Sequence, residues 1–244
     1  MLVCMALLIS SSPALASQTK LKASVPSFPP FNYFVENSQC AGASVVALEM
    51  IFEKLNVELE LVSYPYARIL HSLKNAELDL ALIFKNNSIS HDINYIGPVA
   101  YSKIIILSQP NHTINQYDDL QALKRIAVIR NAQFEKKFDQ DKGLNKVSVD
   151  SYQQAIRMLK HGRVDAVIGS LIGLEYALLQ QNMNQDMLSN AFYLGKKEWG
   201  LHLAKNSNFA KLKPDLIKAV KQTFKTDLIH QLYQQQIQHC VSTN

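Results

Sequence analysis

The sequence lacks the patterns on which most nucleotide-dependent and metal-dependent enzymes rely. It contains only eight glycines, and neither a phosphate-binding P-loop nor a dinucleotide-binding glycine pattern occurs. The seven histidines are scattered, without an i, i+4 pair beside a partner carboxylate, so no metal site is indicated. The segment Gly169 to Gly173 (GSLIG) is not a G-x-S-x-G nucleophile elbow, because its serine directly follows the glycine. We therefore expect no cofactor.

Long apolar runs and an excess of one charge are also missing. After residue 16, no segment has the roughly twenty apolar residues that a transmembrane helix requires. The net charge is +5, with Lys and Arg interspersed among Asp and Glu, which is typical of a solvated surface and not of a nucleic-acid partner. The 48% hydrophobic content favours a packed core over disorder.

The first residues have the pattern of an export signal. Leu2 to Ile9 is an apolar run too short to span a bilayer, and Ala14-Leu15-Ala16 supplies the small-x-small pattern that a signal peptidase recognises. We predict a signal peptide over 1–16 and a mature protein in the periplasm. No Lys or Arg precedes the apolar run, so an N-terminal helix stays as the alternative.

Cysteine is scarce, with three residues in the chain. Cys4 precedes the apolar run and does not indicate a lipid anchor. In an oxidising compartment, the remaining pair, Cys40 and Cys240, is expected to form one disulfide. Two free thiols are the alternative.

Short apolar runs alternate with segments of helical period along most of the chain. Strands are predicted over 21–25, 58–62, 78–83, 100–107, 126–129, 146–149, 164–168 and 192–194. Helices are predicted over 43–55, 66–73, 133–138, 152–159, 214–224 and 228–238. Continuously apolar strands separated by helices are typical of an α/β fold with mostly parallel sheets covered on both faces.

A weak internal repeat relates residues 66–83 to residues 152–169. Without gaps, the identical pairs are Tyr66 and Tyr152, Leu73 and Leu159, Lys74 and Lys160, Asp79 and Asp165. Both copies predict a helix, a polar turn and a strand that follows an aspartate. Duplication of one sheet is the favoured interpretation, and chance similarity of two helix-turn-strand units is the alternative.

The repeat divides the chain into two lobes. Lobe 1 is predicted over 17–103 and 196–244, and lobe 2 over 104–195, with crossover strands at 100–107 and 192–194 as the hinge. A ligand is expected between the sheets, at the carboxyl ends of the strands.

The order and spacing of several segments resemble a known family, the type II periplasmic solute-binding proteins, family 3, which serve amino-acid ABC transporters. The segments that carry this resemblance are 27–31 (SFPPF), 42–55, 73–79 (LKNAELD), 119–120, 126–129 and 161–167. It implies a two-lobe, hinged, monomeric binding protein. Its expected partners are a small-molecule solute and a membrane permease complex.

The resemblance also implies ligand contacts. Phe28 and Tyr66 match the two aromatic residues that hold a ligand side chain in this family, although Phe28 could instead pack on its own loop. Arg68 is expected to bind an anion or to be an ordinary solvated arginine. Contacts are also expected from two segments, Phe84-Lys85-Asn86 after the third strand and Arg130, Asn131 and Gln133 at the N-terminus of a helix in lobe 2.

Both charged clamps for an α-amino acid are replaced. The position of the family's carboxylate-binding Arg falls on His91, and that of the ammonium-binding Asp or Glu falls on Ser170. An uncompensated charge in a closed cleft costs several kcal/mol, so a plain amino acid is disfavoured. Lys85 or Arg68 could replace one clamp, which keeps a small polar or anionic solute as the expected ligand.

Two alternative functions stay open. One is an enzyme resembling the cyclohexadienyl or arogenate dehydratases of the same fold, with Glu198 as the acid. The other is a periplasmic ligand sensor that signals to a membrane partner.

Overall fold

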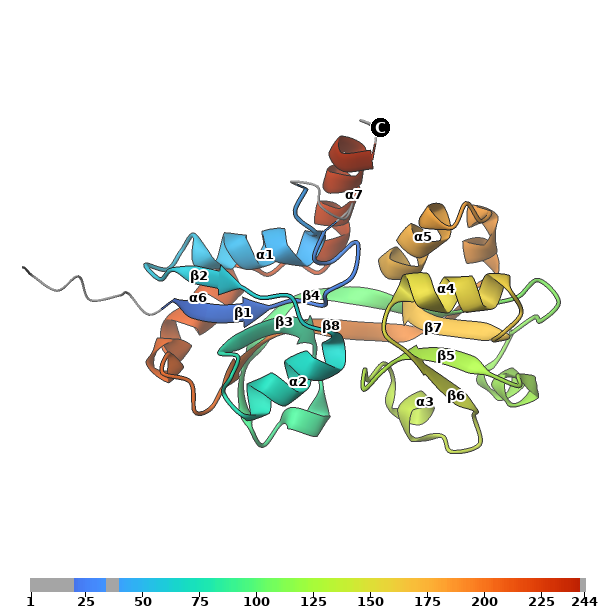
Figure 1. Cartoon of the computed structure of the whole chain (residues 1–244), viewed down its shortest axis with the longest axis horizontal. Helices are drawn as coiled ribbons and strands as arrows, with labels where there is room; N and C mark the ends of the chain where they lie inside the picture. Colours follow the sequence, from blue (N-terminus) through green and yellow to red (C-terminus); the bar gives the residue numbers. More distant parts are fainter. Residues whose placement is uncertain (1–19, 34–39, 242–244) are drawn as a thin grey trace, which may run out of the picture.

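One eight-stranded sheet runs through the whole molecule in the order β2-β1-β3-β8-β4-β7-β5-β6 (Figure 1). The structure, a computed structural model, describes residues 20–33 and 40–241, so the predicted signal peptide lies outside the described residues. Lobe 1 contains β1 (Leu21–Ser24), α1 (Ala43–Phe52), β2 (Leu59–Leu61), α2 (Tyr66–Lys74), β3 (Leu80–Phe84), α6 (Lys213–Thr223) and α7 (Leu228–Val241). Lobe 2 contains β5 (Ile126–Ile129), α3 (Lys136–Gln140), β6 (Lys146–Val149), α4 (Tyr152–Lys160), β7 (Ala166–Ser170) and α5 (Leu171–Gln180).

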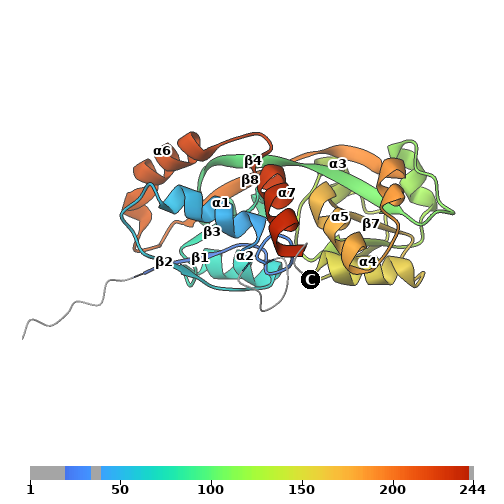
Figure 2. The ribbon, with the colours of Figure 1, turned by 90° about the horizontal axis from the view of Figure 1, so that it is seen from above.

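Two long antiparallel strands, β4 (Ile93–Ser108) and β8 (Phe192–Ala204), connect the lobes (Figure 2). Their pairing extends from Ile93 opposite Ala204 to Ile106 opposite Phe192. The predicted strand 192–194 is thus only the beginning of one long strand that continues to Ala204. The lobe boundaries that we predicted at 103 and 195 both fall inside these strands.

The two lobes repeat one topology, and the predicted mostly parallel α/β fold is confirmed. In lobe 1, β1 pairs in parallel with β2 and β3. In lobe 2, β5 pairs in the same way with β6 and β7. In Figure 1, α1 and α2 lie on opposite sides of the sheet in lobe 1, and α4 and α3 do so in lobe 2.

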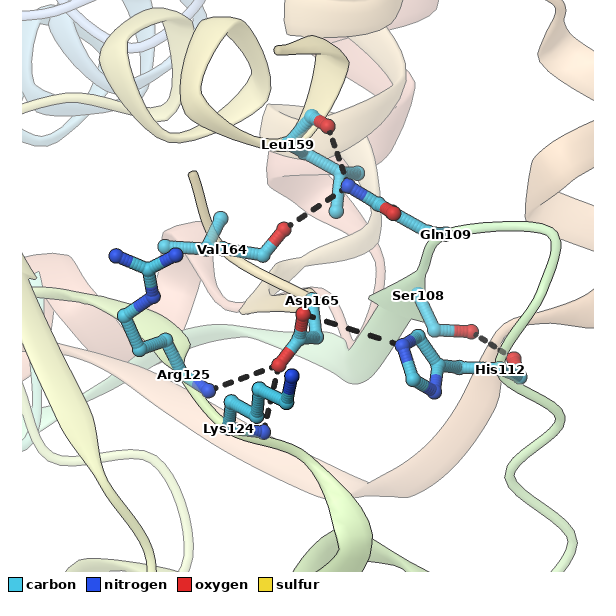
Figure 3. A network of polar contacts seen from close by, with 8 residues as sticks. All are labelled: Ser108, Gln109, His112, Lys124, Arg125, Leu159, Val164 and Asp165. Atoms are coloured by element: carbon cyan, nitrogen blue, oxygen red, sulfur yellow. Dashed lines mark hydrogen bonds and ion pairs between the residues drawn. The ribbon is translucent and has the colours of Figure 1, made fainter. Parts of the chain in front are cut away.

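The repeated aspartates have the same role in each lobe. Asp79 accepts a hydrogen bond from the backbone N–H of Lys22 in β1, at 2.9 Å. Asp165 accepts two, from Lys124 at 2.6 Å and Arg125 at 3.0 Å, immediately before β5 (Figure 3). Each carboxylate therefore binds the beginning of the neighbouring parallel strand, which explains why both copies of the repeat need an acid there.

The C-terminal helix α7 packs on α1 and completes lobe 1. Cys40, just before α1, and Cys240, in α7, form a disulfide with their Cα atoms 6.0 Å apart. The bridge therefore ties together the two separate parts of the chain that make up lobe 1.

Two helices differ from their predictions. The helix predicted over 133–138 begins only at Lys136 and has five residues. No helix was predicted at 171–180, where α5 follows β7 without a break. Its apolar residues follow the strand's apolar run, and Ser170, the N-cap of α5, marks the boundary, a helix-start signal that the prediction did not use.

Candidate functional site

The carboxyl ends of β1, β3, β5 and β7 face one another between the lobes, and aromatic side chains meet there. Phe28, on the loop after β1, lies edge-on to Tyr152 of lobe 2, with ring centroids 5.4 Å apart. Phe31 lies 6.4 Å from the same tyrosine. Edge-to-face contacts of this kind are favourable. The loop after β1 thus contacts the first residue of α4 across the cleft.

Trp199, the one tryptophan of the sequence, continues this cluster from the hinge strand β8. Its ring lies 4.3 Å from Phe84 and 5.0 Å from Phe31, and its indole N–H donates to Ser102 Oγ at 2.7 Å. Phe84 in turn lies 6.3 Å from Phe134 of lobe 2. Trp199 was not among the predicted site residues.

Polar contacts between the lobes involve three of the predicted residues. The buried Asn86 amide donates to the carbonyl oxygen of Asn131 at 3.0 Å. The backbone N–H of Asn87 donates to Gln133 Oε1 at 2.9 Å. The structure therefore brings Asn86, Asn131 and Gln133 together, although we could not predict what they would touch. These bonds join the ends of β3 and β5.

Tyr66, at the first residue of α2, is buried next to these contacts. Burial raises the pKa of its phenol above its usual range, and the nearby Asn86 amide lowers it by a smaller amount. The Tyr66 hydroxyl makes no hydrogen bond of normal geometry within the described residues.

Lys85 points to the hinge and not to a free cleft surface. Its ammonium lies 3.6 Å from Glu198 Oε1 and 4.4 Å from the centroid of the Tyr95 ring. The Tyr95 hydroxyl donates to the same carboxylate, and the Tyr101 hydroxyl lies 3.3 Å from its other oxygen. Burial, followed by the hydrogen bond to Glu198 and then the charge of Glu198, raises the pKa of Tyr95. Lys85 thus already has an acidic partner.

Two predicted arginines are exposed and bound to their own lobes. The Arg68 guanidinium lies 4.2 Å from the Tyr64 ring centroid. Arg130 pairs with Asp150 at 3.0 Å. Neither is brought to the contacts between the lobes.

His91 also lies away from the cleft. Its carbonyl oxygen accepts a hydrogen bond from the Lys205 ammonium, next to the end of β8. From Trp199 to Ala204 the strand spans about 17 Å, and Trp199 is the residue at the cleft. We placed His91 by counting without gaps, but the chain after Asn86 turns back along the sheet.

Ser170 and Asn131 have structural roles that the sequence pattern did not reveal. The Ser170 hydroxyl accepts from the N–H of Gly173 at 3.3 Å and caps α5, and its own N–H donates to Tyr152 Oη at 3.1 Å. Asn131 has a positive φ of 61°, in a turn five residues before α3 begins. The predicted anion site at a helix N-terminus is therefore wrong at Asn131.

A cavity of about 460 Å³ opens between α2 and α3. We call it the α2–α3 cavity. Lobe 1 contributes Leu70, His71, Lys74 and Ser88 to its lining, and lobe 2 contributes Asn131, Gln133, Phe134, Asp139 and Lys146, among others. This volume lies in the usual range of small-molecule sites, about 300–1,000 Å³. The hydrogen bonds that Asn131 and Gln133 make to lobe 1 lie in its wall.

Charged groups of lobe 2 and of the hinge lie close together beside this cavity. Both Asp139 oxygens accept from the N–H of Phe134, at 3.0 and 3.1 Å, while burial raises the pKa of this carboxyl. Burial lowers the pKa of Lys146 and of Lys197, and the Asp139 charge opposes both shifts. The lobe 2 side of the cavity therefore combines positive groups with an acid that already has a hydrogen-bond partner.

In the part of the chain that the structure describes, no three His, Cys, Asp or Glu side chains come together as a metal site. No helix between residues 20 and 241, leaving out 34–39, is long and apolar enough to cross a membrane.

Two lobes joined by two long strands, with the strand ends facing a shared cleft, define a two-lobe binding protein of the periplasmic type. The chain belongs to the bacterial extracellular solute-binding proteins, family 3, whose model matches residues 22–237.

Two curated relatives are arginine-binding proteins by name. ABC transporter arginine-binding protein 1 of Escherichia coli (strain K12) is 25% identical over 172 residues, covering 69% of this chain and 70% of the relative. The arginine-binding periplasmic protein of Mannheimia haemolytica is 26% identical over 147 residues, which is 60% of each chain. The second alignment thus spans less than two thirds of that relative.

Solved structures share the fold. An ancestral arginine-binding protein bound to arginine superposes with a TM-score of 0.70 at 21% identity, covering 88% of this chain and 97% of that one. A histidine kinase sensor domain similar to periplasmic binding proteins gives 0.72 at 16% identity, covering 89% and 96%. At these identities the likeness concerns the fold alone.

Proposed function

We propose that this protein captures a small polar or anionic solute between its lobes in the periplasm and delivers it to an ABC-type transporter in the membrane. The observation that carries this is the set of side chains from both lobes that meet at the strand ends, Asn86 with Asn131 and Phe28 with Tyr152. These contacts exist only when the lobes are together. A ligand that bridges the lobes can therefore shift the protein toward the closed arrangement.

The lobe boundaries at 103/104 and 195/196 belong to this proposal. Bending within β4 and β8 would open and close the cleft, because these strands are the long connections between the lobes. Membership of an extracellular family supports export, and the named relatives support a transporter as the partner.

Binding without catalysis is also part of the proposal. Glu198, the one acid nominated for an enzymatic role, is held by Lys85, Tyr95 and Tyr101. Its oxygens are therefore engaged by groups of the protein itself. Turnover of an arogenate-like substrate that is lost in Glu198→Gln would contradict this part.

A thermal-shift screen of the purified exported protein tests the function. The panel contains arginine and other amino acids, polyamines, carboxylates, small sugars and peptides. A ligand at 100 times its Kd adds about 2.7 kcal/mol of stability, which raises Tm by roughly 5–10 °C in a chain of this size. No shift with any compound of the panel would contradict a solute-binding role.

A further inference from the structure

We infer that the solute lies in the α2–α3 cavity, and that it is a small organic acid with an apolar body and no ammonium group. This rests on the proposed function and specifies where the solute binds and of which chemical class it is. It replaces the aromatic sandwich and the amino-acid ligand that the family resemblance implies.

The two rings expected to hold a ligand are covered by the protein. Phe28 is 6% exposed and Tyr66 is 4% exposed. Phe28 packs against Phe31 and Tyr152, whose ring centroids lie 5.7 and 5.4 Å away. A ring that stacks on a ligand must offer an open face, and neither of these rings does. Binding between them would require the cluster to separate.

The α2–α3 cavity offers an accessible surface instead, with a part that suits an apolar body. Ala67 from lobe 1 and Val128 and Ala132 from lobe 2 are half-buried apolar residues of its lining. Because both lobes form it, the cavity has this shape only when they are together. An occupant would therefore stabilise the closed arrangement, as hinge closure requires.

The charges beside the cavity favour an acid. Lys74, on the last turn of α2, has no acidic partner within the described residues. Lys146 lines the cavity from lobe 2, and its ammonium donates to the carbonyl oxygens of Phe138 and Asp139, the latter at 3.2 Å. A carboxylate between the two lysines would be bound from both lobes at once.

An ammonium group would find no comparable partner. The Asp139 carboxylate already accepts from Phe134, and Glu135 accepts from the N–H of Phe138 at 3.1 Å as the N-cap of α3. Two of the charged residues that line the cavity are lysines, Lys74 and Lys146, and one is an acid, Asp139. A cationic amine there would therefore be repelled.

Three compounds that share one body test the class: 3-phenylpropanoate, its amide and phenylalanine. A second series of 4-methylpentanoate, its amide and leucine repeats the comparison with an aliphatic body. We expect the two carboxylates to raise Tm, and the amides and amino acids to leave it unchanged. An amino acid that binds as tightly as its deaminated acid would overturn the chemical class while the solute-binding function stands.

Two variants test the place. Lys74→Gln should weaken carboxylate binding about tenfold, the usual size for a hydrogen bond to a charged group. Lys54→Gln, an exposed lysine at the far end of lobe 1, serves as the matched control. Ala67→Trp should abolish binding by filling the cavity from α2. The Tm of each variant without ligand shows that it is folded.

The outcomes separate the two claims. Equal carboxylate affinity in Lys74→Gln and Lys54→Gln, or full affinity in Ala67→Trp, would overturn the placement. Carboxylates that fail while sugars, amino acids or polyamines bind would overturn the class and keep the function. Failure of every compound in the wider panel would overturn both.

Discussion

The disulfide should be the largest single covalent contribution to the stability of lobe 1. It joins Cys40 to Cys240 across a sequence separation of 200 residues. Cross-linking so long a loop removes much of the conformational entropy of the unfolded chain, which corresponds to about 5 kcal/mol at 25 °C. For a chain of this size that loss lowers Tm by roughly 10–20 °C.

Thermal unfolding, followed by circular dichroism with and without a thiol reductant, measures this loss. Cys240→Ser and the double variant with Cys40→Ser should have the same lowered Tm, because one bridge is lost in each. The reductant should not affect the double variant. Ligand affinity should be unchanged, since neither cysteine lines the α2–α3 cavity. A wild-type Tm that the reductant leaves within about 2 °C, against the expected drop, would refute the bridge.

Three further predictions concern buried groups. Burial lowers the pKa of His202 to about 4 from 6.5, so the folded protein favours the neutral imidazole. This preference contributes about 3 kcal/mol to the free energy of unfolding. The contribution is complete above pH 6.5 and is lost as the pH falls to 4. Denaturant midpoints at both pH values should show this loss in the wild type, and His202→Leu should lack it. Gly173→Ala should lower Tm despite alanine's better helix propensity, because the new Cβ would lie 2.4 Å from the Tyr152 ring; a raised Tm would contradict this packing. Asp165→Ala should cost about 1–3 kcal/mol by leaving the N–H groups of Lys124 and Arg125 without their acceptor, and an unchanged denaturant midpoint would refute that role.

Much of the fold could be predicted because local signals determine it. The strands at 126–129 and 146–149 are found with the predicted bounds. Each is a short run that lacks the apolar spacing of a helix, so the sequence favours a strand there. The two aspartates of the repeat mark the turns into β3 and β7, and their equivalent hydrogen bonds support the interpretation of a duplicated sheet.

The site was harder to predict because its geometry depends on how the chain packs over long distances. Asn86, Asn131 and Gln133 were expected as contacts, and they meet between the lobes. His91 and Ser170 were placed by matching positions of a family in which those positions carry charged residues. A turn after β3 and a helix cap after β7 use them differently, and the family match took precedence over the N-cap signal that Ser170 provides.

Asn131 and Gln133, which line the α2–α3 cavity, were predicted as contacts, but its two lysines had no sequence signal. Lys74 looks like an ordinary exposed residue on a helix, and Lys146 like one at the start of an edge strand. Only the three-dimensional arrangement brings them to the same space.

Small-angle X-ray scattering, recorded with and without the best ligand from the thermal-shift screen, tests the central claim most directly. That claim is that two lobes close around a solute through bending of β4 and β8. The account predicts a smaller radius of gyration and a shorter maximum dimension when the ligand is present. A ligand that raises Tm but leaves both quantities unchanged at saturation would contradict closure by hinge motion.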